Sequence, residues 1–401
     1  MPSTVVLAWE LGGGYGHIHP LWSIGDALMR RGHNLVVIVK ELHRAEVAFG
    51  GLGIPILQAP MAARARTRPS DLCTLGQTLG MAGYDCVEHF GPIYRAWRVL
   101  LESVGPALVV GDYAPTGLLA ARGLGIPRIE VGNGWTTPPL SIPSPHLSPW
   151  KTPPSRDVLL AREGKIVAVV NRVLQRCGDE PIGALADLHD TEDRFLLTFP
   201  ELDHFGPRPE SAYLGTLASG HATDTPPWPA GDGPRIFGYL SARYGGFDRL
   251  VAQLGTSGRP TLIHARDLEP ARAKAASTPS LRFSPGMVDV SVAFGQADLV
   301  VSHGGHGTAS QALLHGCPLL VLPEHDEQAL TGHNLARAGM GVSVGHRLGV
   351  EHDYGALVDT LATEDKYRVA AARFAARHAD FDQAASVVQM ADRCEALIER
   401  G

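Results

Sequence analysis

Two glycine-rich stretches of the chain each carry a histidine between an expected strand and an expected helix. Residues 12–20, Gly-Gly-Gly-Tyr-Gly-His-Ile-His-Pro, follow an apolar run at residues 5–9, and residues 302–308, Ser-His-Gly-Gly-His-Gly-Thr, follow one at residues 297–301. Without Cβ atoms, the backbone N–H groups of such a turn can close on a ligand, and the positive end of the following helix favours an anion. The second stretch therefore predicts a phosphate site, and its alternative is a tight turn that buries a histidine.

The first stretch is not a dinucleotide-binding turn. Gly12 and Gly14 match the first two glycines of G-x-G-x-x-G, but His17 stands where the third is needed. His17 and Asp112 each follow an expected strand, and ligands of parallel sheets gather beyond the carboxyl ends of strands. If those strands are neighbours, the two side chains face one crevice. Taken singly, each residue more often has a structural role: His17 as a polar surface group, and Asp112 as a cap for the helix near residue 116.

Polar side chains also follow the apolar run at residues 319–322. Pro323 is followed within five residues by Glu327 and Gln328, which together offer a carboxylate and an amide. These groups can accept and donate hydrogen bonds to the hydroxyls of a sugar. The alternative is a polar cluster that caps the helix expected at residues 329–338.

These turns need parallel strands, covered by helices, to position them. Apolar runs alternate with helical patterns in both halves of the chain, which predicts an α/β fold with two similar domains that face a central cleft. A segment rich in Gly, Thr, Ser and Pro separates the halves and marks a boundary. We expect an N-terminal domain at residues 1–215, a linker at 216–232, a second domain at 233–366, and C-terminal helices at 367–401 that can pack back on the first domain.

Composition narrows the class of protein. The chain has 401 residues, 44% of them hydrophobic and 19% charged, and a formal net charge of -6. This balance is typical of globular domains and favours neither nucleic acid nor an anionic membrane as a partner. The five cysteines include no C-x-x-C pair, so their spacing indicates neither a disulfide framework nor a zinc site. With no basic leader and no apolar run of membrane-spanning length, we expect a cytoplasmic protein without an integral membrane segment.

Two segments of the first half carry less information. Residues 62–70 hold three arginines and are expected to form a solvated loop. Residues 136–154 contain seven prolines, which exclude a regular helix. We expect a long loop there, and a lid over a bound acceptor is one use for it.

Taken together, the motifs resemble those of a known family. Residues 303–308 (HGGHGT), 316–318 (GCP) and 339–341 (GMG), with Pro323 and the Glu327–Gln328 pair, resemble the donor-binding half of metal-independent glycosyltransferases that act on small molecules. This is the bacterial antibiotic, macrolide and flavonoid branch of the UDP-glycosyltransferases, which is related to the plant UDP-glucosyltransferases. Gly16-His17-x-x-Pro20 and Asp112 are similar to the acceptor-binding half, so the resemblance spans nearly the whole chain.

The resemblance implies the GT-B fold, in which the C-terminal Rossmann-like domain binds a nucleotide sugar and the N-terminal one binds the acceptor. It assigns the diphosphate to His303 and to the backbone near the start of the following helix, whose positive end takes the place of a divalent ion. The resemblance assigns other positions of this half to contacts with the phosphates, the base, the ribose and the sugar of the donor. The full donor-binding set is Ser241, Met287, Val288, His303, Gly305, His306, Gly307, Thr308, Gln311, Glu327 and Gln328.

The resemblance also implies the reaction. His17 would remove the proton of an acceptor hydroxyl, and Asp112 would orient the imidazole and stabilise its charge. Direct displacement at the anomeric carbon inverts its configuration. The family implies no cofactor and no metal, a UDP-sugar as donor with a dTDP-sugar as second choice, and a small-molecule acceptor, for which a lipid-linked compound is one alternative.

Several positions depart from the family pattern. Met287 stands where relatives usually carry an aromatic residue, and Asp289 stands where they carry proline. Gln311 replaces the usual ribose-binding glutamate, and Glu327 replaces the commoner aspartate. Two other functions share this architecture: a nucleotide-sugar 2-epimerase, and a non-catalytic partner protein that binds a nucleotide sugar. The residues predict neither the acceptor nor the oligomeric state.

Overall fold

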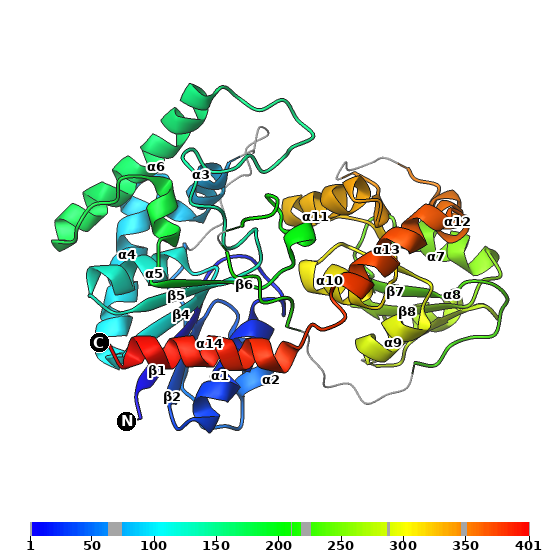
Figure 1. Ribbon diagram of the computed structural model, residues 1–401, viewed down its shortest axis with the longest axis horizontal. Helices are drawn as coiled ribbons and strands as arrows, with labels where there is room; N and C mark the ends of the chain where they lie inside the picture. The colour runs from blue at the N-terminus through cyan, green and yellow to red at the C-terminus, as the bar shows by residue number, and fades with distance from the viewer. Residues whose placement is uncertain are drawn as a thin grey trace. The chain divides into compact units, whose positions relative to one another are not determined.

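The chain folds into two compact units in the computed structural model (Figure 1), which describes residues 2–62, 74–209, 211–217, 226–286, 289–345 and 351–400. The first unit combines Met1–Leu217 with Asp382–Gly401, and the second is Ala218–Phe381. Each unit is a six-stranded sheet with parallel pairing between all neighbouring strands, covered by helices. The predicted α/β class with two Rossmann-like domains is confirmed.

The first unit has the strand order β3-β2-β1-β4-β5-β6. Its strands are β1 (Thr4–Trp9), β2 (Asn34–Val39), β3 (Ile56–Gln58), β4 (Leu108–Asp112), β5 (Arg128–Gly132) and β6 (Asp193–Leu196). Its α-helices are α1 (Ile18–Arg30), α2 (Leu42–Phe49), α3 (Leu75–Leu79), α4 (Val87–Val104), α5 (Pro115–Gly123), α6 (Arg156–Cys177) and α14 (Gln383–Ile398). A π-helical turn, η1 (Gly80–Tyr84), continues α3, and two short 3₁₀ turns are η2 (Leu185–His189) and η3 (Pro200–Leu202).

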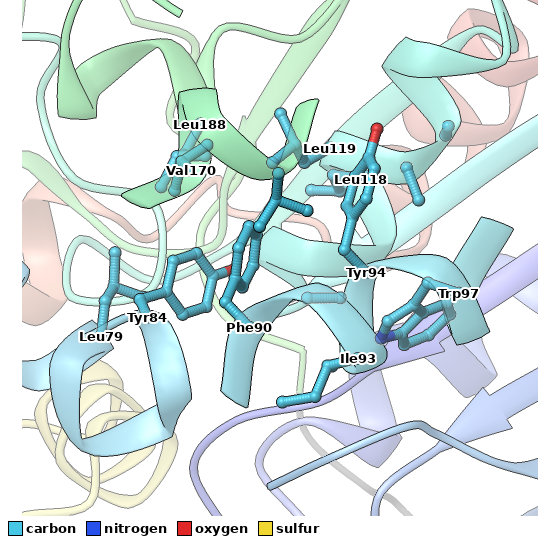
Figure 2. Close-up of a cluster of buried hydrophobic side chains, with 14 of the residues drawn as sticks. Leu79, Tyr84, Phe90, Ile93, Tyr94, Trp97, Leu118, Leu119, Val170 and Leu188 are labelled. Carbon is cyan, nitrogen blue, oxygen red and sulfur yellow. The ribbon is translucent and has the colours of Figure 1, made fainter. Parts of the chain in front are cut away.

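Burial on both faces of this sheet explains its continuous apolar strands. In β1, Val6 and Ala8 belong to the core on one side, while Val5, Leu7 and Trp9 belong to the core on the other. Successive side chains of a strand point to opposite faces, so a strand covered on both sides has no polar alternation. The first of these cores contains aromatic residues of η1 and α4, and Figure 2 shows them packed with leucines of α5.

The second unit repeats the same topology, with the order β12-β11-β10-β7-β8-β9. Its strands are β7 (Ile236–Ser241), β8 (Thr261–Arg266), β9 (Leu281–Phe283), β10 (Leu299–Ser302), β11 (Leu319–Val321) and β12 (Gly341–Ser343). Its helices are α7 (Phe247–Thr256), α8 (Pro270–Ala276), α9 (Val290–Gln296), α10 (His306–Leu314), α11 (Asp326–Arg337), α12 (Tyr354–Thr363) and α13 (Asp365–Arg377).

The topology places a switch point in each sheet. In the first unit the chain moves outward from β1 to β2 and β3, and then returns to the other side of β1 with β4. In the second unit β7 and β10 hold the equivalent central positions. Open α/β sheets bind ligands beyond the carboxyl ends of the strands at such a point. A ligand site is therefore expected after β1 and β4, and another after β7 and β10.

The two helices of the C-terminal tail divide between the units. α13 packs against α10 of the second unit, whereas α14 packs against α1 of the first. Arg31, just after α1, holds α14 in place, since its Nη1 lies 2.7 Å from Asp392 Oδ1 and 2.6 Å from Glu395 Oε2. None of the helices in the described part of the chain combines the length and apolar character that a bilayer crossing needs.

Candidate active site

The structure pairs His17 and Asp112 at the switch point of the first unit. β1 and β4 are neighbours, and their register sets Trp9 opposite Asp112 at the ends of the two strands. The loop after β1 then brings His17 Nδ1 to 3.0 Å from Asp112 Oδ1. Because a carboxylate accepts at Nδ1, that nitrogen carries the proton and Nε2 is the basic atom of the ring. The side chains are 12% and 3% exposed, so the pair is shielded from solvent.

Aromatic side chains hold the His17 ring from two sides. Trp9 stacks on it, with ring centroids 5.1 Å apart and an interplanar angle of 23°. Tyr113 lies next to it at 6.1 Å in a tilted arrangement. Tyr113 has a φ of 50°, an uncommon conformation for a residue with a side chain, and its carbonyl accepts from Leu11 N at 3.0 Å. The two loops that carry His17 and Asp112 are therefore joined through their backbones as well.

Gly12 lies directly against the basic nitrogen. Its φ is +74°, and a Cβ added there would stand 2.5 Å from His17 Nε2. The position thus requires glycine both for the backbone conformation and for the space in front of the ring. A substrate hydroxyl that approaches Nε2 needs the same space.

Glu10 is a buried carboxylate that joins the same two loops. Its Oε2 accepts from Thr116 N at 3.0 Å and Gly117 N at 3.1 Å, and Oε1 accepts from the Thr116 hydroxyl. Glu10 therefore caps α5, a task that the sequence left open for Asp112. Burial raises the pKa of the Glu10 carboxyl to about 7, although these hydrogen bonds act in the opposite direction. Sequence reasoning missed Glu10 because its partners lie more than 100 residues away along the chain.

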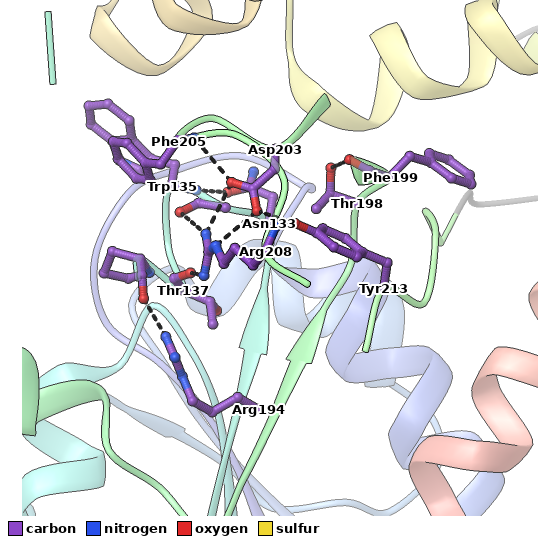
Figure 3. Close-up of polar contacts among 12 residues, drawn as sticks. Asn133, Trp135, Thr137, Arg194, Thr198, Phe199, Asp203, Phe205, Arg208 and Tyr213 are labelled. Atoms are coloured by element: carbon purple, nitrogen blue, oxygen red, sulfur yellow. Dashed lines mark hydrogen bonds and ion pairs between the residues drawn. The ribbon is translucent and has the colours of Figure 1, made fainter. Parts of the chain in front are cut away.

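The proline-rich segment of the first unit is fixed at both ends. Residues 133–155, all of them described, contain no helix or strand. Arg208 Nη1 donates to the Thr137 carbonyl at 2.8 Å, and its Nε lies 2.9 Å from Asp203 Oδ2, as Figure 3 shows for the whole polar cluster. Further along, Glu163 Oε1 of α6 accepts from Ser144 N at 2.8 Å. The predicted long loop is present, and its use as a lid stays a prediction.

In the second unit, His303 joins three strand ends. Its Nδ1–H donates to the Leu322 carbonyl at 2.9 Å, just after β11, and its Nε2 accepts from Ser241 N at 2.9 Å, at the end of β7. His303 itself follows β10. Burial lowers the pKa of the His303 imidazole, which keeps the ring neutral near pH 7. In this arrangement Nε2 has no hydrogen to donate to a phosphate. The ring instead holds the turn in place through its hydrogen bonds to the backbone.

The glycines after His303 open the start of α10. Gly304 has a φ of +80°, and a Cβ there would lie 2.5 Å from Val321 Cγ1, so the turn packs tightly on β11. At Gly305 no described atom lies within 4 Å of a Cβ position, and Gly305, as the N-cap residue of α10, makes no side-chain cap hydrogen bond. A helix leaves the N–H groups of its first turn without intrahelical partners. Here those groups belong to His306, Gly307 and Thr308, and they form a site suited to an anion.

The remaining donor-side residues are placed as follows. Gln311 is half-buried in α10, and Glu327 is half-buried in the first turn of α11. Gln328 Oε1 accepts from Glu324 N at 2.8 Å, which ties the first turn of α11 to the segment before it. The N-cap residue of α11, His325, makes no side-chain cap hydrogen bond. Met287 and Val288 lie outside the described residues. Asp289, the departure next to them, caps α9, because its Oδ1 accepts from Ser291 N at 2.9 Å.

Sequence reasoning also missed a stacked pair beside this region. Tyr239 of β7 and His264 of β8 face each other in register, with ring centroids 5.3 Å apart and an interplanar angle of 18°. His264 Nδ1 lies 3.1 Å from Ser284 Oγ and 3.2 Å from the Gly286 carbonyl. The flat pair can pack against an aromatic ligand. No spacing in the sequence marks it, since the two residues meet only through the strand register.

Comparisons with known proteins agree with this geometry. Residues 268–397 match the family model described as erythromycin biosynthesis protein CIII-like, C-terminal domain. The chain is 26% identical over 422 residues to 4'-demethylrebeccamycin synthase of Lentzea aerocolonigenes, covering 96% of this chain and 97% of the relative. It is 24% identical over 363 residues to zeaxanthin glucosyltransferase of Pantoea ananas, covering 82% of this chain and 81% of the relative.

Solved structures show the same fold. The calicheamicin glycosyltransferase CalG4 superposes with a TM-score of 0.69 at 18% identity, covering 100% of this chain and 99% of that one. The glycosyltransferase VinC, solved with dTDP, also gives a TM-score of 0.69, at 15% identity, with 99% of this chain and 100% of that one covered. The fold, the two switch-point sites and the relatives together define a glycosyltransferase of the GT-B class. Within that class, residues 268–397 carry the EryCIII-like C-terminal domain.

Proposed function

We propose that the protein transfers a sugar from a nucleoside diphosphate sugar to a hydroxyl of a small natural product, with inversion at the anomeric carbon. The observation that carries the proposal is the His17–Asp112 hydrogen bond at the first switch point, with Nε2 left as the base. Relatives named for zeaxanthin and for rebeccamycin support a natural-product acceptor.

The donor is proposed to bind the second unit through its diphosphate. The start of α10, whose N-cap residue is a glycine, offers backbone N–H groups and the positive end of the helix dipole. His303 keeps this turn in place through Ser241 and Leu322. We propose a UDP- or dTDP-sugar, with Gln311 at the ribose and Glu327 and Gln328 at the sugar hydroxyls. The solved VinC structure holds dTDP, which supports a pyrimidine nucleotide.

The proposed reaction is a single displacement. The acceptor oxygen attacks the anomeric carbon while His17 Nε2 takes its proton, and the bond from that carbon to the diphosphate oxygen breaks. Asp112 stabilises the imidazolium that forms, and the first turn of α10 takes up the negative charge of the leaving nucleoside diphosphate. The chemistry in this scheme is supplied by side chains and backbone amides, so we propose that no cofactor or metal takes part.

A transfer assay with a single-residue variant tests this proposal. Wild-type protein and His17→Ala are incubated with UDP-glucose or dTDP-glucose and a panel of macrolide, flavonoid and carotenoid alcohols, and products are followed by mass spectrometry. General-base catalysis typically contributes about 10²–10⁴-fold, so the variant should lose that much in kcat. Its affinity for UDP or dTDP, measured by calorimetry, should stay unchanged.

Three outcomes would contradict the proposal. His17→Ala could keep the wild-type rate, which would remove His17 as the base. The wild-type protein could convert a free nucleotide sugar without any acceptor, which would indicate an epimerase. Binding of the nucleotide without turnover of any donor or acceptor would indicate a non-catalytic partner protein.

A further inference from the structure

Three side chains with different metal-binding atoms meet at the start of α4. Cys86 is the N-cap residue of this helix, Asp85 precedes it, and His89 lies in its first turn. Cys86 Sγ lies 3.1 Å from His89 Nδ1, which in turn lies 3.4 Å from Asp85 Oδ1. One ligand atom from each residue falls within 4.8 Å of the other two. Local helix geometry explains the meeting, because residues three and four positions apart share a helix face.

The separations suit a tetrahedral cation. Zinc binds thiolate sulfur at about 2.3 Å and imidazole nitrogen or carboxylate oxygen at about 2.0–2.2 Å. In a tetrahedron these lengths put sulfur and nitrogen about 3.6 Å apart, and nitrogen and oxygen about 3.4 Å apart. The observed nitrogen–oxygen separation of 3.4 Å equals the tetrahedral value, whereas the sulfur–nitrogen separation of 3.1 Å is about half an ångström shorter. The thiol and the carboxylate, whose ligand atoms lie within 4.8 Å of each other, would have to rotate to complete the coordination.

The surroundings allow a cation to enter. The His89 and Asp85 side chains are 53% and 28% exposed, and Cys86 is half-buried. Within the described residues the Cys86 thiol makes no cap hydrogen bond to the α4 backbone. Its contacts are with the His89 ring and with the Glu88 carboxylate, both in the first turn of α4. A thiolate and a carboxylate together would neutralise a divalent charge.

We propose that Asp85, Cys86 and His89 form a binding site for a thiophilic divalent cation such as Zn²⁺, with a fourth position open to water. Sulfur and imidazole ligands favour zinc over magnesium or calcium, which prefer oxygen. The lack of a C-x-x-C pair argues against zinc sites built from paired cysteines. It does not argue against a site with the mixed sequence D-C-x-x-H. The site is separate from the proposed transfer reaction and does not depend on it.

A bound cation would stiffen the segment between η1 and α4, which contacts α5 through Tyr84. Tyr84, next to Asp85, is 1% exposed, and its hydroxyl lies 2.7 Å from Thr116 Oγ1. Thr116 is the residue that Glu10 caps. A cation that ties Asp85 to His89 would fix the end of η1 against α4. Because the unfolded chain lacks this geometry, binding should raise the midpoint of thermal unfolding.

Cobalt substitution tests the site directly. Reduced protein is titrated with Co²⁺, and we expect a near-ultraviolet thiolate-to-cobalt band with visible d–d bands that saturate at a single cation per chain. Zn²⁺ should displace the cobalt and raise the unfolding midpoint. Cys86→Ser should abolish the thiolate band, and His89→Ala should weaken Co²⁺ binding at least about tenfold, the order of effect of losing a metal-site group.

Cys177→Ser is the matched control, because Cys177 is also a half-buried free cysteine on a helix of the first unit. It should keep the band and the Zn²⁺-dependent midpoint. The proposal is overturned if wild-type protein gives no thiolate band at saturating Co²⁺. It is equally overturned if the band survives in Cys86→Ser, or if Cys177→Ser removes it. Both cysteines are partly exposed, so we expect each variant to fold. Circular dichroism of each variant checks this.

Discussion

At the scale of single residues, the reactivity of His17 depends on which atoms its ring can present. Asp112 uses Nδ1, so a proton taken from a substrate has to be accepted at Nε2. Gly12 faces this nitrogen, and a Cβ added there would stand 2.5 Å from Nε2. Gly12 therefore keeps the space beside Nε2 open, although it contributes no functional group.

Gly12→Ala should abolish most transfer activity while leaving nucleotide binding intact. The added methyl group meets Nε2, and displacement of a catalytic group by about 1 Å can cost about 100-fold in rate. Gly14→Ala is the control, because Gly14 has a φ of +93° but no described atom lies within 4 Å of its Cβ position. Both variants carry the backbone strain of about 1–2 kcal/mol that a side chain suffers there. Equal kcat values for the two would show that space at Nε2 is unimportant.

Glu10 gives the first unit an unusual pH dependence. Its pKa is raised from 4.5 to about 7 by burial, so between these values the folded protein keeps a proton that the unfolded chain has lost. The free energy of unfolding then falls as pH rises through this window and levels off above about pH 7. This is opposite in sign to the effect of a carboxylate in a salt bridge.

Glu10→Gln should remove that dependence. The amide oxygen can still accept from Thr116 and Gly117, and the amide nitrogen can donate to the Thr116 hydroxyl. Relative to wild type, the variant should gain stability between pH 5 and pH 8, by at most about 3 kcal/mol for a shift of this size. Urea unfolding followed by tryptophan fluorescence measures it, since five of the six tryptophans lie in the first unit. A constant difference between the two proteins at both pH values would contradict the assignment.

At the scale of elements, the turn between β10 and α10 depends on a side chain that bridges three strand ends. His303 supplies one donor and one acceptor to two backbone groups that come from β7 and from the segment after β11. Both groups are buried with the ring, and a buried polar group without a partner costs about 1–3 kcal/mol. The start of α10 is thus held in place by the strand ends around it.

His303→Ala should both destabilise the second unit and weaken binding of UDP or dTDP. His303→Gln should recover part of each, because its amide also carries a donor and an acceptor. Differential scanning calorimetry and isothermal titration calorimetry on the same samples measure the two effects. If alanine lowered affinity with no change in the unfolding midpoint, the ring would act on the ligand directly and the bridging role proposed here would be wrong.

The sequence predicted those site residues that directly follow a strand. His17 and Asp112 could be paired because each follows a strand, and strand ends of a parallel sheet meet at one edge. Glu10, the orientation of the His303 ring and the Tyr239–His264 stack could not be predicted. Their partners are set by the register of segments 20 to about 100 residues apart, which local patterns do not encode.

At the scale of the whole molecule, the same strand order occurs in both units, and each unit has polar side chains or helix amides at its own switch point. Periodic apolar runs were sufficient to predict this repeated α/β organisation. The path of the tail was harder to predict, because α13 and α14 are both alanine-rich and their patterns do not tell which unit each helix covers. Buried residues of α14 such as Met390 and Cys394 belong to a core of the first unit, together with strand residues from the start of the chain.

The return of α14 has a consequence for the order in which the protein is made. A ribosome releases the first unit's strands long before it reaches Gln383, so that core stays open on one side throughout synthesis of the second unit. The second unit, Ala218–Phe381, is a continuous segment and can fold as soon as it emerges. The first unit to be translated is therefore the last to be completed. Until then, the apolar residues that pack on Met390 and Cys394 lack the helix that completes their core.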